Sequence, residues 1–164
     1  MSQVTVESGA TVALFGFGVT GRAVASELIE RNTSVLVFDD SPNEEMVSAA
    51  EAIGVNLVTP KSEKELYKDI EDVDFAIPTP GLRESHFFFK TVADRGIPIL
   101  TEFDLAAQWD NRPILAITGT NGKTTVSTMV HEMLERSGIV SALAGNTDIP
   151  LVSAIRKDET ETMV

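Results

Sequence analysis

Short apolar runs alternate along this chain with longer amphipathic stretches, and this alternation predicts its secondary structure. In the first two thirds of the sequence, apolar runs rich in β-branched residues predict strands at 11–16, 34–39, 55–58, 73–77 and 97–100. The amphipathic stretches between them predict helices at 20–31, 43–53, 62–70 and 84–95. Continuous apolar strands separated by helices are typical of a parallel sheet that is covered on both faces. Residues 1–110 are therefore predicted to form a small Rossmann-like α/β domain.

The same alternation starts again after turn-forming residues at 110–113, which we interpret as a domain boundary. The first elements predicted after it are a strand at 112–118, a loop at 119–122 and a helix at 123–137. They are followed by a strand at 139–143, a helix at 150–157 and the start of a further strand at 162–164. Residues 111–164 are therefore expected to be the first part of a second α/β domain with an incomplete sheet. We expect this second unit to be the less stable one.

The composition narrows the possible classes of function. The 164 residues include 25 acidic and 13 basic side chains, a net charge of −12, which argues against broad binding to nucleic acid or an anionic membrane. A local phosphate site remains compatible with this acidity, because backbone N–H groups can bind an anion. No apolar run reaches the ~18–20 residues of a membrane span. The sequence has no cysteine, which excludes disulfides and zinc–thiolate sites within it. A cytoplasmic, monomeric protein is expected.

The first glycine cluster, Gly16-Phe17-Gly18-Val19-Thr20-Gly21, follows a predicted strand and opens a predicted helix. In that position glycines allow a tight turn and a close approach of the backbone to a diphosphate at the helix N-terminus. Asp39 ends the second predicted strand, near the place where an acidic residue meets a ribose or a base. The cluster predicts nucleotide binding, and the alternative is that its glycines only allow close strand–helix packing. Asp40 and Ser41 are also compatible with a plain polar turn and helix cap.

The second glycine cluster, Thr118-Gly119-Thr120-Asn121-Gly122-Lys123-Thr124-Thr125, also follows an apolar run and opens a predicted helix. It is shorter than the standard G-x-x-x-x-G-K-[ST] motif, because Ile117 stands in the place of the first glycine. The backbone N–H groups of such a loop surround a β-phosphate, Lys123 neutralises the β- and γ-phosphate oxygens, and the Thr124 hydroxyl ligates Mg²⁺. The cluster predicts binding of a nucleoside triphosphate, with a plain strand–helix turn as the alternative.

Other polar and aromatic positions carry weaker signals. The turn Thr79-Pro80-Gly81 follows the fourth predicted strand at the same sheet edge as the first glycine cluster, so it could line the same ligand, although a plain turn is favoured. His86 and His131 have no carboxylate or histidine at ligand spacing and are interpreted as surface helix residues. The three phenylalanines at 87–89 are predicted to pack one helix onto the sheet.

Together, these motifs resemble the Mur ligase family. The cluster at 16–21, the turn at 79–82, the string at 118–125 and Gly145-Asn146 follow the family's pattern over nearly the whole chain. The T-G-T-N-G-K-T-T string is highly characteristic of ATP-dependent Mur and folylpolyglutamate ligases. Within the family, the G-x-G-x-T-G opening and the T-P-G turn favour the member that adds D-glutamate to UDP-N-acetylmuramoyl-L-alanine in peptidoglycan synthesis. The chain resembles about the first third of such an enzyme and is expected to be a fragment.

The resemblance implies an N-terminal domain that binds UDP and a central domain of P-loop type that binds Mg-ATP. It implies UDP contacts at Gly18, Val19, Thr20, Asp39, Asp40, Thr79, Pro80, Gly81 and Asn146. It implies ATP contacts at Gly119, Thr120, Asn121, Gly122, Lys123, Thr124 and Thr125. Lys123 and Thr124 would take the catalytic roles, with Thr124 on Mg²⁺. Where the family usually reads G-N-I-G, this chain reads Gly145-Asn146-Thr147-Asp148, and Asp148 adds a negative charge near a bound anion.

The family mechanism converts the substrate carboxylate into an acyl phosphate at the expense of ATP, and the amine of D-glutamate then attacks it. The family's further magnesium-binding acid, modified lysine and amino-acid-binding domain would lie beyond Val164, so we expect this chain alone not to complete the reaction. Two other interpretations stay open. One is another ligase of the superfamily with a different UDP-peptide or a folate substrate. The other is a non-enzymatic nucleotide-binding module, such as an NAD(P)-sensing Rossmann domain.

Overall fold

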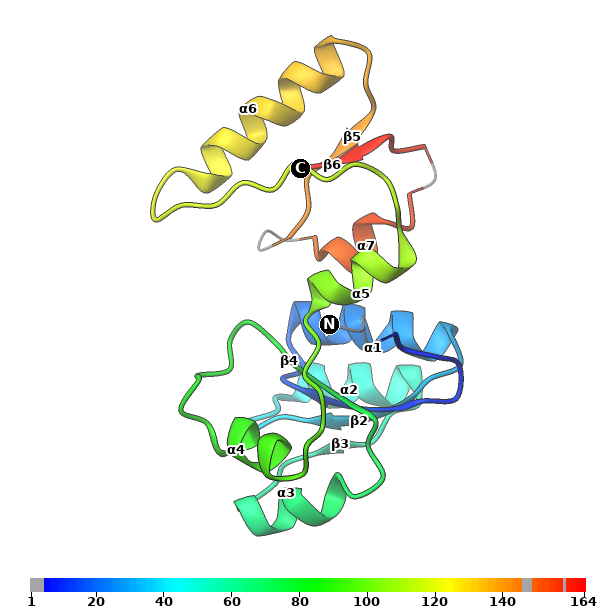
Figure 1. Cartoon of the computed structure of the whole chain (residues 1–164), viewed down its shortest axis with the longest axis vertical. Helices are drawn as coiled ribbons and strands as arrows, with labels where there is room; N and C mark the ends of the chain where they lie inside the picture. Colours follow the sequence, from blue (N-terminus) through cyan, green and yellow to red (C-terminus); the bar gives the residue numbers. More distant parts are fainter. Residues whose placement is uncertain (1–4, 146–148, 158) are drawn as a thin grey trace. The chain divides into compact units, whose positions relative to one another are not determined.

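The computed structural model describes residues 5–145, 149–157 and 159–164. The chain divides into two compact units, residues 1–105 and 106–164. In both units parallel strands alternate with helices, as the hydrophobic pattern predicts (Figure 1).

Four parallel strands form the sheet of the first unit, in the order β3-β2-β1-β4. They are β1 (Thr11–Phe15), β2 (Ser34–Phe38), β3 (Leu57–Val58) and β4 (Phe75–Pro78). The helices are α1 (Val19–Glu30), α2 (Glu44–Ile53), α3 (Glu63–Asp69) and α4 (Phe87–Asp94), and α5 (Glu102–Trp109) spans the division between the units. This sheet confirms the predicted Rossmann-like α/β class. The strand that precedes the first glycine cluster, β1, pairs with β2 on one side and β4 on the other.

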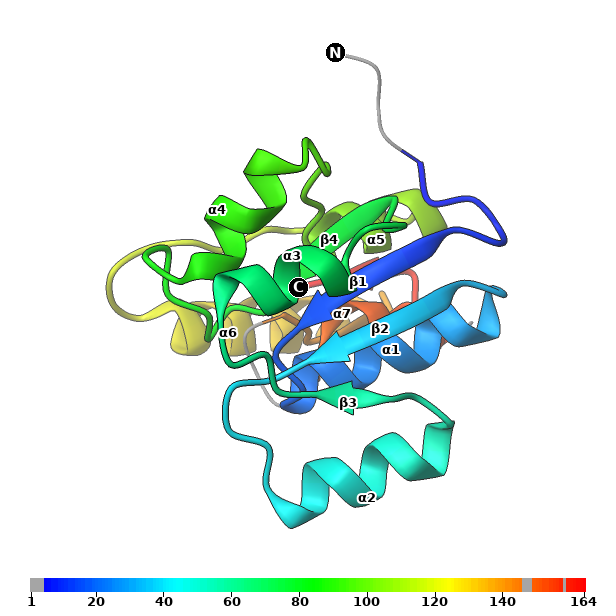
Figure 2. The same ribbon diagram turned by 90° about the horizontal axis from the view of Figure 1, so that it is seen from below.

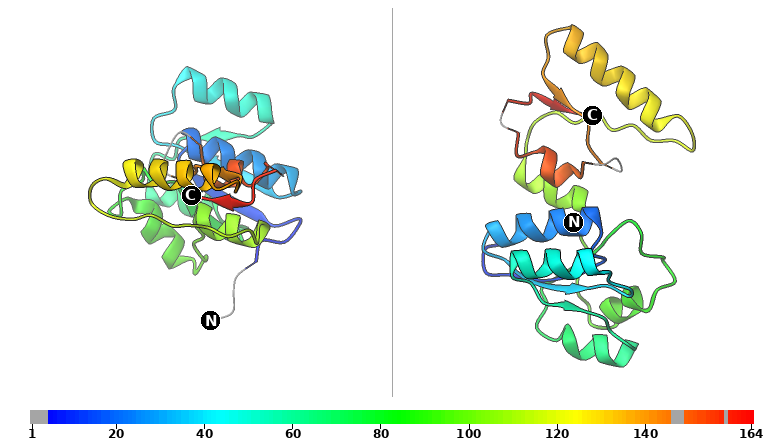
Figure 3. Two further views of the ribbon diagram at one scale, coloured as in Figure 1. Left: turned by 90° about the horizontal axis from the view of Figure 1, so that it is seen from above. Right: turned by 180° about the vertical axis from the view of Figure 1, so that it is seen from behind.

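Helices cover both faces of this sheet: α1 and α2 lie on one face, and α3 and α4 lie on the other (Figure 2 and Figure 3). The face towards α3 and α4 carries a cluster of buried side chains that includes Phe15, Phe38 and Phe88. Phe88 is fully buried, as the interpretation of the 87–89 run predicts. Burial of one such aromatic side chain contributes about 1.5–3 kcal/mol, so the cluster stabilises the unit by several such contributions.

The largest differences from the prediction in the first unit lie at 84–109. Of the predicted strand at 97–100, only Ile99 forms a bridge, with Ala76, and the segment then turns into α5. This helix was missed, although Thr101 and Asp104 form a reciprocal cap: the Thr101 N–H donates to the Asp104 carboxylate at 2.7 Å, and the Asp104 N–H donates to the Thr101 hydroxyl at 3.2 Å. The helix predicted at 84–95 begins later, as α4, because the ring of His86 caps its first turn.

The second unit contains α6 (Lys123–Arg136), β5 (Ser141–Ala142), α7 (Leu151–Ala154) and β6 (Thr162–Met163), with β5 and β6 paired in parallel. The prediction of a strand at 112–118 is wrong as an extended element: within the described residues, only Ile114 forms a bridge, with Met163. The Met163 N–H donates to the Pro113 carbonyl at 3.0 Å, and the Leu115 N–H donates to the Met163 carbonyl at 2.9 Å. The segment thus forms one register pair with β6, whereas β5 forms two with the same strand.

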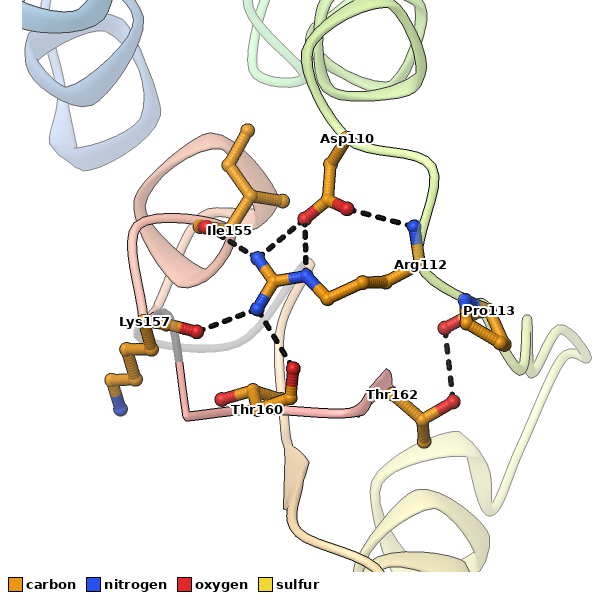
Figure 4. A network of polar contacts seen from close by, with 7 residues as sticks. All are labelled: Asp110, Arg112, Pro113, Ile155, Lys157, Thr160 and Thr162. Carbon is orange, nitrogen blue, oxygen red and sulfur yellow. Dashed lines mark hydrogen bonds and ion pairs between the residues drawn. The ribbon is translucent and has the colours of Figure 1, made fainter.

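Arg112 organises the start of this segment through a network of hydrogen bonds (Figure 4). Its guanidinium donates to the Asp110 carboxylate, with Nε at 2.7 Å, and to the backbone carbonyls of Ile155, Lys157 and Thr160. The hydrogen bonds from Arg112 hold the pKa of the Asp110 carboxyl below its ordinary value. Arg112 therefore joins the turn at 110–113 to the backbone carbonyls of the segment that follows α7.

The apolar face of α6 is exposed, although all of its residues are described. None of them is buried, and Met129 and Met133 are 59% and 66% exposed. The helix is attached at its C-terminal end, where His131 Nδ1 lies 2.7 Å from the Ser141 hydroxyl and the Ser141 N–H donates to Glu135 at 2.6 Å. That N–H holds the pKa of Glu135 below its ordinary value. In the ranges 5–145, 149–157 and 159–164, none of the helices is long and apolar enough to cross a membrane.

Candidate functional site

The first glycine cluster forms the loop between β1 and α1, and two of its glycines are required by packing. Gly16 has φ +97°, and a Cβ there would lie 2.1 Å from the Thr79 hydroxyl oxygen. A Cβ on Gly21 would lie 2.0 Å from the Gly16 carbonyl oxygen. These two positions match the alternative in which glycine allows close strand–helix packing. Thr79 is thereby placed against the glycine loop.

Gly18 differs from the other two glycines, because a Cβ there would meet open space. It is the N-cap residue of α1, and no side chain caps the helix at this end. The first N–H groups of a helix have no intrahelical acceptors, so those of Val19 and Thr20 make no helical hydrogen bond. They lie at the positive end of the helix dipole. Arg22 pairs with Glu45 at 2.6 Å, so the attraction for an anion comes chiefly from the backbone. This end of α1 has the geometry of an anion site.

Asp39, one of the predicted UDP contacts, is hydrogen-bonded to the backbone of the glycine loop and of the turn after β2. One of its carboxylate oxygens accepts the Phe17 N–H at 2.8 Å, and the other accepts the Ser41 N–H at 2.9 Å. Both oxygens are thus used to tie the glycine loop to the end of β2. Asp39 shapes the loop, and it has less remaining capacity than Asp40 for hydroxyl or N–H groups of a ligand.

The interpretation of His86 as an isolated surface residue is wrong. His86 Nε2 lies 3.0 Å from Oδ2 of Asp40, and its side chain is only 15% exposed, whereas that of Asp40 is 50% exposed. The imidazole packs against Phe15 with ring centroids 4.9 Å apart. Spacing along the chain gave no signal of this pair, because 46 residues separate its members. Parallel strands bring them together, since β2 and β4 end at the same edge of the sheet.

A cavity of about 680 Å³ opens beside this pair. Its lining residues are Asp40, Gly81, Leu82, Arg83, Ser85, His86 and Phe87. Two of the predicted UDP contacts, Asp40 and Gly81, therefore share one cavity. Pro80 is exposed beside it and is not among the lining residues. Asn146, with Thr147 and Asp148, lies outside the described residues. Sequence reasoning missed the contributions of Arg83, Ser85, His86 and Phe87.

The second glycine cluster forms an exposed loop that leads into α6. Gly119 has φ +148° and Gly122 has φ +78°, conformations that L side chains rarely adopt. Gly122 is the N-cap of α6, and no side chain caps the helix. The Lys123 ammonium donates to the Gly119 carbonyl, so it lies across the loop at the same end of the helix.

This second loop fits a magnesium-bound polyphosphate. The uncapped N-terminus of α6 offers backbone donors, Lys123 adds a positive charge, and Thr124 and Thr125 bring hydroxyl groups to the first turn of the helix. The remaining predicted contacts, Thr120 and Asn121, are exposed in the same loop. In the described part of the chain no three histidine or acidic side chains gather into a possible metal cluster.

Comparison with known proteins places the two loops in context. Residues 117–164 match the Mur ligase middle domain. The UDP-N-acetylmuramoylalanine--D-glutamate ligase of Desulfosudis oleivorans is 32% identical over 155 residues, which cover 93% of this chain and 33% of that protein. The enzyme of the same name from Tropheryma whipplei is 35% identical over 152 residues, covering 90% and 31%. The chain thus spans about a third of the length of these relatives.

Solved structures show the same fold at lower sequence identity. A UDP-N-acetylmuramate:L-alanyl-gamma-D-glutamyl-meso-diaminopimelate ligase from Neisseria meningitides superposes with a TM-score of 0.58 at 18% identity, covering 96% of this chain and 52% of that one. A murein peptide ligase from Psychrobacter arcticus superposes with a TM-score of 0.55 at 21% identity, covering 82% and 28%. At these identities the likeness extends to the fold alone.

Proposed function

We propose that this chain supplies the UDP-binding domain and the first part of the ATP-binding domain of a Mur ligase. The chain is homologous to the N-terminal third of members of that family. The reaction proposed for the whole protein is the ATP-dependent addition of D-glutamate to UDP-N-acetylmuramoyl-L-alanine. In this proposal residues 1–110 bind the UDP-substrate, and residues 111–164 begin the ATP-binding domain. The observation that carries the proposal is the presence of two uncapped helix N-termini, each preceded by a glycine loop, in one acidic chain.

The UDP diphosphate is proposed to bind at the N-terminus of α1. Gly18 leaves room for the diphosphate, and the N–H groups of Val19 and Thr20 provide hydrogen-bond donors. Such backbone donors allow an acidic domain to bind an anion without a basic surface. The nucleoside would then extend into the cavity that contains Asp40 and Gly81. Asp39 and Thr79, which the resemblance also places among the UDP contacts, shape the glycine loop of this site.

The phosphate loop at 118–125 is proposed to hold ATP. Mg²⁺ and ATP, when bound, supply the phosphoryl group that activates the substrate carboxylate. Lys123 would move from the Gly119 carbonyl onto the phosphate oxygens and offset the charge on the transferring phosphoryl group. The backbone donors of Gly119 to Gly122 would orient the phosphates, and the Thr124 hydroxyl would hold the cation. We propose that residues 1–164 bind these nucleotides without forming the amide bond, because they span a third of the relatives' length.

The NAD(P)-sensing alternative receives no support from the acidic residue that ends β2. In dinucleotide-binding Rossmann folds such a residue binds the ribose hydroxyls. Here both oxygens of Asp39 accept backbone N–H groups. Two of the roughly four acceptor positions of this carboxylate are therefore already used, which leaves fewer of them for the ribose of a dinucleotide.

Calorimetric titration of residues 1–164 with UDP, NAD⁺ and Mg-ATP tests the proposal. We expect UDP and Mg-ATP to bind at separate sites and NAD⁺ not to compete with UDP.

Gly18→Asp should abolish UDP binding, because an aspartate caps the helix and repels the diphosphate, while the fold keeps its stability. Gly18→Ser supplies a neutral cap as the matched control. Lys123→Met should weaken Mg-ATP alone, with the exposed Lys157→Met as its control. Tight NAD⁺ binding without UDP competition would overturn the proposal.

A further inference from the structure

We infer that His86 is a positioning residue: it fixes the carboxylate of Asp40 so that the cavity recognises the imide N–H of a uracil base. This inference rests on the proposed function, and it adds a residue whose role in the site no sequence motif indicates. The pair joins the end of β2 to the first turn of α4 at the wall of the cavity.

The hydrogen bonds of the imidazole define its tautomer. Nδ1 of His86 accepts the Phe88 N–H at 3.1 Å, so this nitrogen carries no proton. The proton of the neutral ring is then on Nε2, which lies 3.0 Å from one oxygen of Asp40 and 3.2 Å from the other. Nε2 is therefore the donor and the carboxylate the acceptor. The same ring caps α4 through one nitrogen and orients Asp40 through the other.

Aromatic contacts restrict the imidazole ring of His86, so it can hold the Asp40 carboxylate in one orientation. It packs between Phe15 and Phe87, with ring centroids 4.9 and 4.2 Å from its own. Asp40 remains half exposed, and one imidazole N–H uses only part of the roughly four acceptor positions of a carboxylate. The remaining acceptor capacity of Asp40 is available to a ligand in the cavity.

The chemistry of the cavity suits a nucleobase better than a sugar. Phe87 and Leu82 provide apolar surface against which a planar ring can lie, and Arg83 brings a planar guanidinium that has only donors. Uracil presents an N3–H donor between two carbonyl acceptors. A carboxylate accepts that N–H, and a guanidinium donates to a neighbouring carbonyl. Asp40, held in one orientation by His86, would thus accept a hydrogen bond from N3–H, the only donor on that edge of uracil.

A pair of ligands that differ at N3 tests this role. UDP and N3-methyl-UDP carry the same diphosphate and ribose, but the second lacks the N–H. We expect residues 1–164 to bind UDP about tenfold more tightly than N3-methyl-UDP, the loss that accompanies one hydrogen bond to a charged group. His86→Asn keeps an oxygen where Nδ1 caps the Phe88 N–H and removes the Nε2 donor. It should reduce the preference to about threefold or less. His86→Gln, which extends an amide donor towards Asp40, should restore most of the preference.

The outcomes separate this inference from the proposed function. If wild-type protein binds UDP and N3-methyl-UDP equally, the inference fails while UDP binding stands. If His86→Asn weakens both ligands by the same factor, His86 is only a structural cap and the inference again fails. Discrimination between UDP and 2′-deoxy-UDP that depends on His86, with none at N3, would assign Asp40 to the ribose and would also overturn it. Failure of wild-type protein to bind UDP at all would overturn the proposed function itself.

Discussion

The two units present the same local motif in different surroundings. In the first unit the glycine loop joins a strand that is paired on both sides to a helix, α1, which buries Val24, Ala25 and Leu28. In the second unit the loop follows a segment with one bridge and leads into α6, which buries no residue. Both loops thus share glycine conformations and an uncapped helix N-terminus, the features proposed to bind an anion. The stability of each loop depends on neighbouring elements, and in the second unit the described residues provide few of them.

Truncation of an apolar side chain should show the largest difference between the units. Phe88→Ala is expected to destabilise the first unit by about 3–5 kcal/mol, because the ring is fully buried. Met133→Ala in α6 should change stability by less than about 0.5 kcal/mol, because its side chain is mostly exposed. Urea unfolding followed by circular dichroism measures both variants. Equal losses would show that α6 is covered in solution and would contradict the comparison.

Loss of the Arg112 network should have the next largest effect, confined to the second unit. Arg112→Met removes hydrogen bonds to Asp110 and to three backbone carbonyls, which should cost about 1.5–3 kcal/mol. Hydrogen exchange should then accelerate at the amides of Thr162 and Met163 and stay unchanged in β1. A double-mutant cycle with Asp110→Asn isolates the ion pair from the carbonyl contacts. Unchanged exchange in the second unit would show that the network does not stabilise it.

Glycine substitutions sharpen the comparison within the first loop. Gly21→Ala should destabilise the first unit by about 1–3 kcal/mol, because the new Cβ would overlap the Gly16 carbonyl. Gly18→Ala should change stability by less than about 0.5 kcal/mol, because its Cβ points into open space. Thermal unfolding of the two variants gives the values. A larger loss for Gly18→Ala would mean that Gly18 serves packing rather than ligand access.

Acid should produce the smallest effect, and it should act on the second unit. Arg112 lowers the pKa of Asp110 in the folded state, so this carboxylate stabilises the fold above its ordinary pKa. The stabilisation should be lost as the pH falls below that ordinary value and through the lower folded-state pKa. Unfolding of wild type and Asp110→Asn between pH 7 and pH 2 measures the difference. An Asp110→Asn variant that keeps the wild-type pH dependence would exclude Asp110 as its source.

The prediction from sequence succeeded where structure is local. The strands β1, β2 and β4 and the helix starts after both glycine clusters follow from apolar runs and glycine positions along the chain. The segment at 112–118 has an equally apolar sequence, but a strand needs neighbours, and β6 supplies one register pair. The missed helix α5 does carry a local signal, the reciprocal cap of Thr101 and Asp104.

The candidate site was predicted in part for the same reason. The glycine loops and Lys123 could be located by position, because their motifs are continuous in the sequence, whereas Asp40 was expected at the site only from the family resemblance. The contact of His86 with Asp40 could not be predicted, because it depends on the order of parallel strands that brings β2 and β4 to one edge. The two hydrogen bonds of Asp39 to the N–H groups of Phe17 and Ser41 could not be predicted either, since they depend on the folded loop.

The central claim is that one chain carries two separate nucleotide sites, one in each unit. Hydrogen exchange of residues 1–164, measured by mass spectrometry with UDP and then with Mg-ATP, tests it most directly. We predict that UDP slows exchange at residues 17–21 and 81–87 and leaves 119–125 unchanged, whereas Mg-ATP slows exchange at 119–125 and leaves 17–21 unchanged. The account would be contradicted if both nucleotides protected the same segment. It would also be contradicted if UDP protected neither 17–21 nor 81–87.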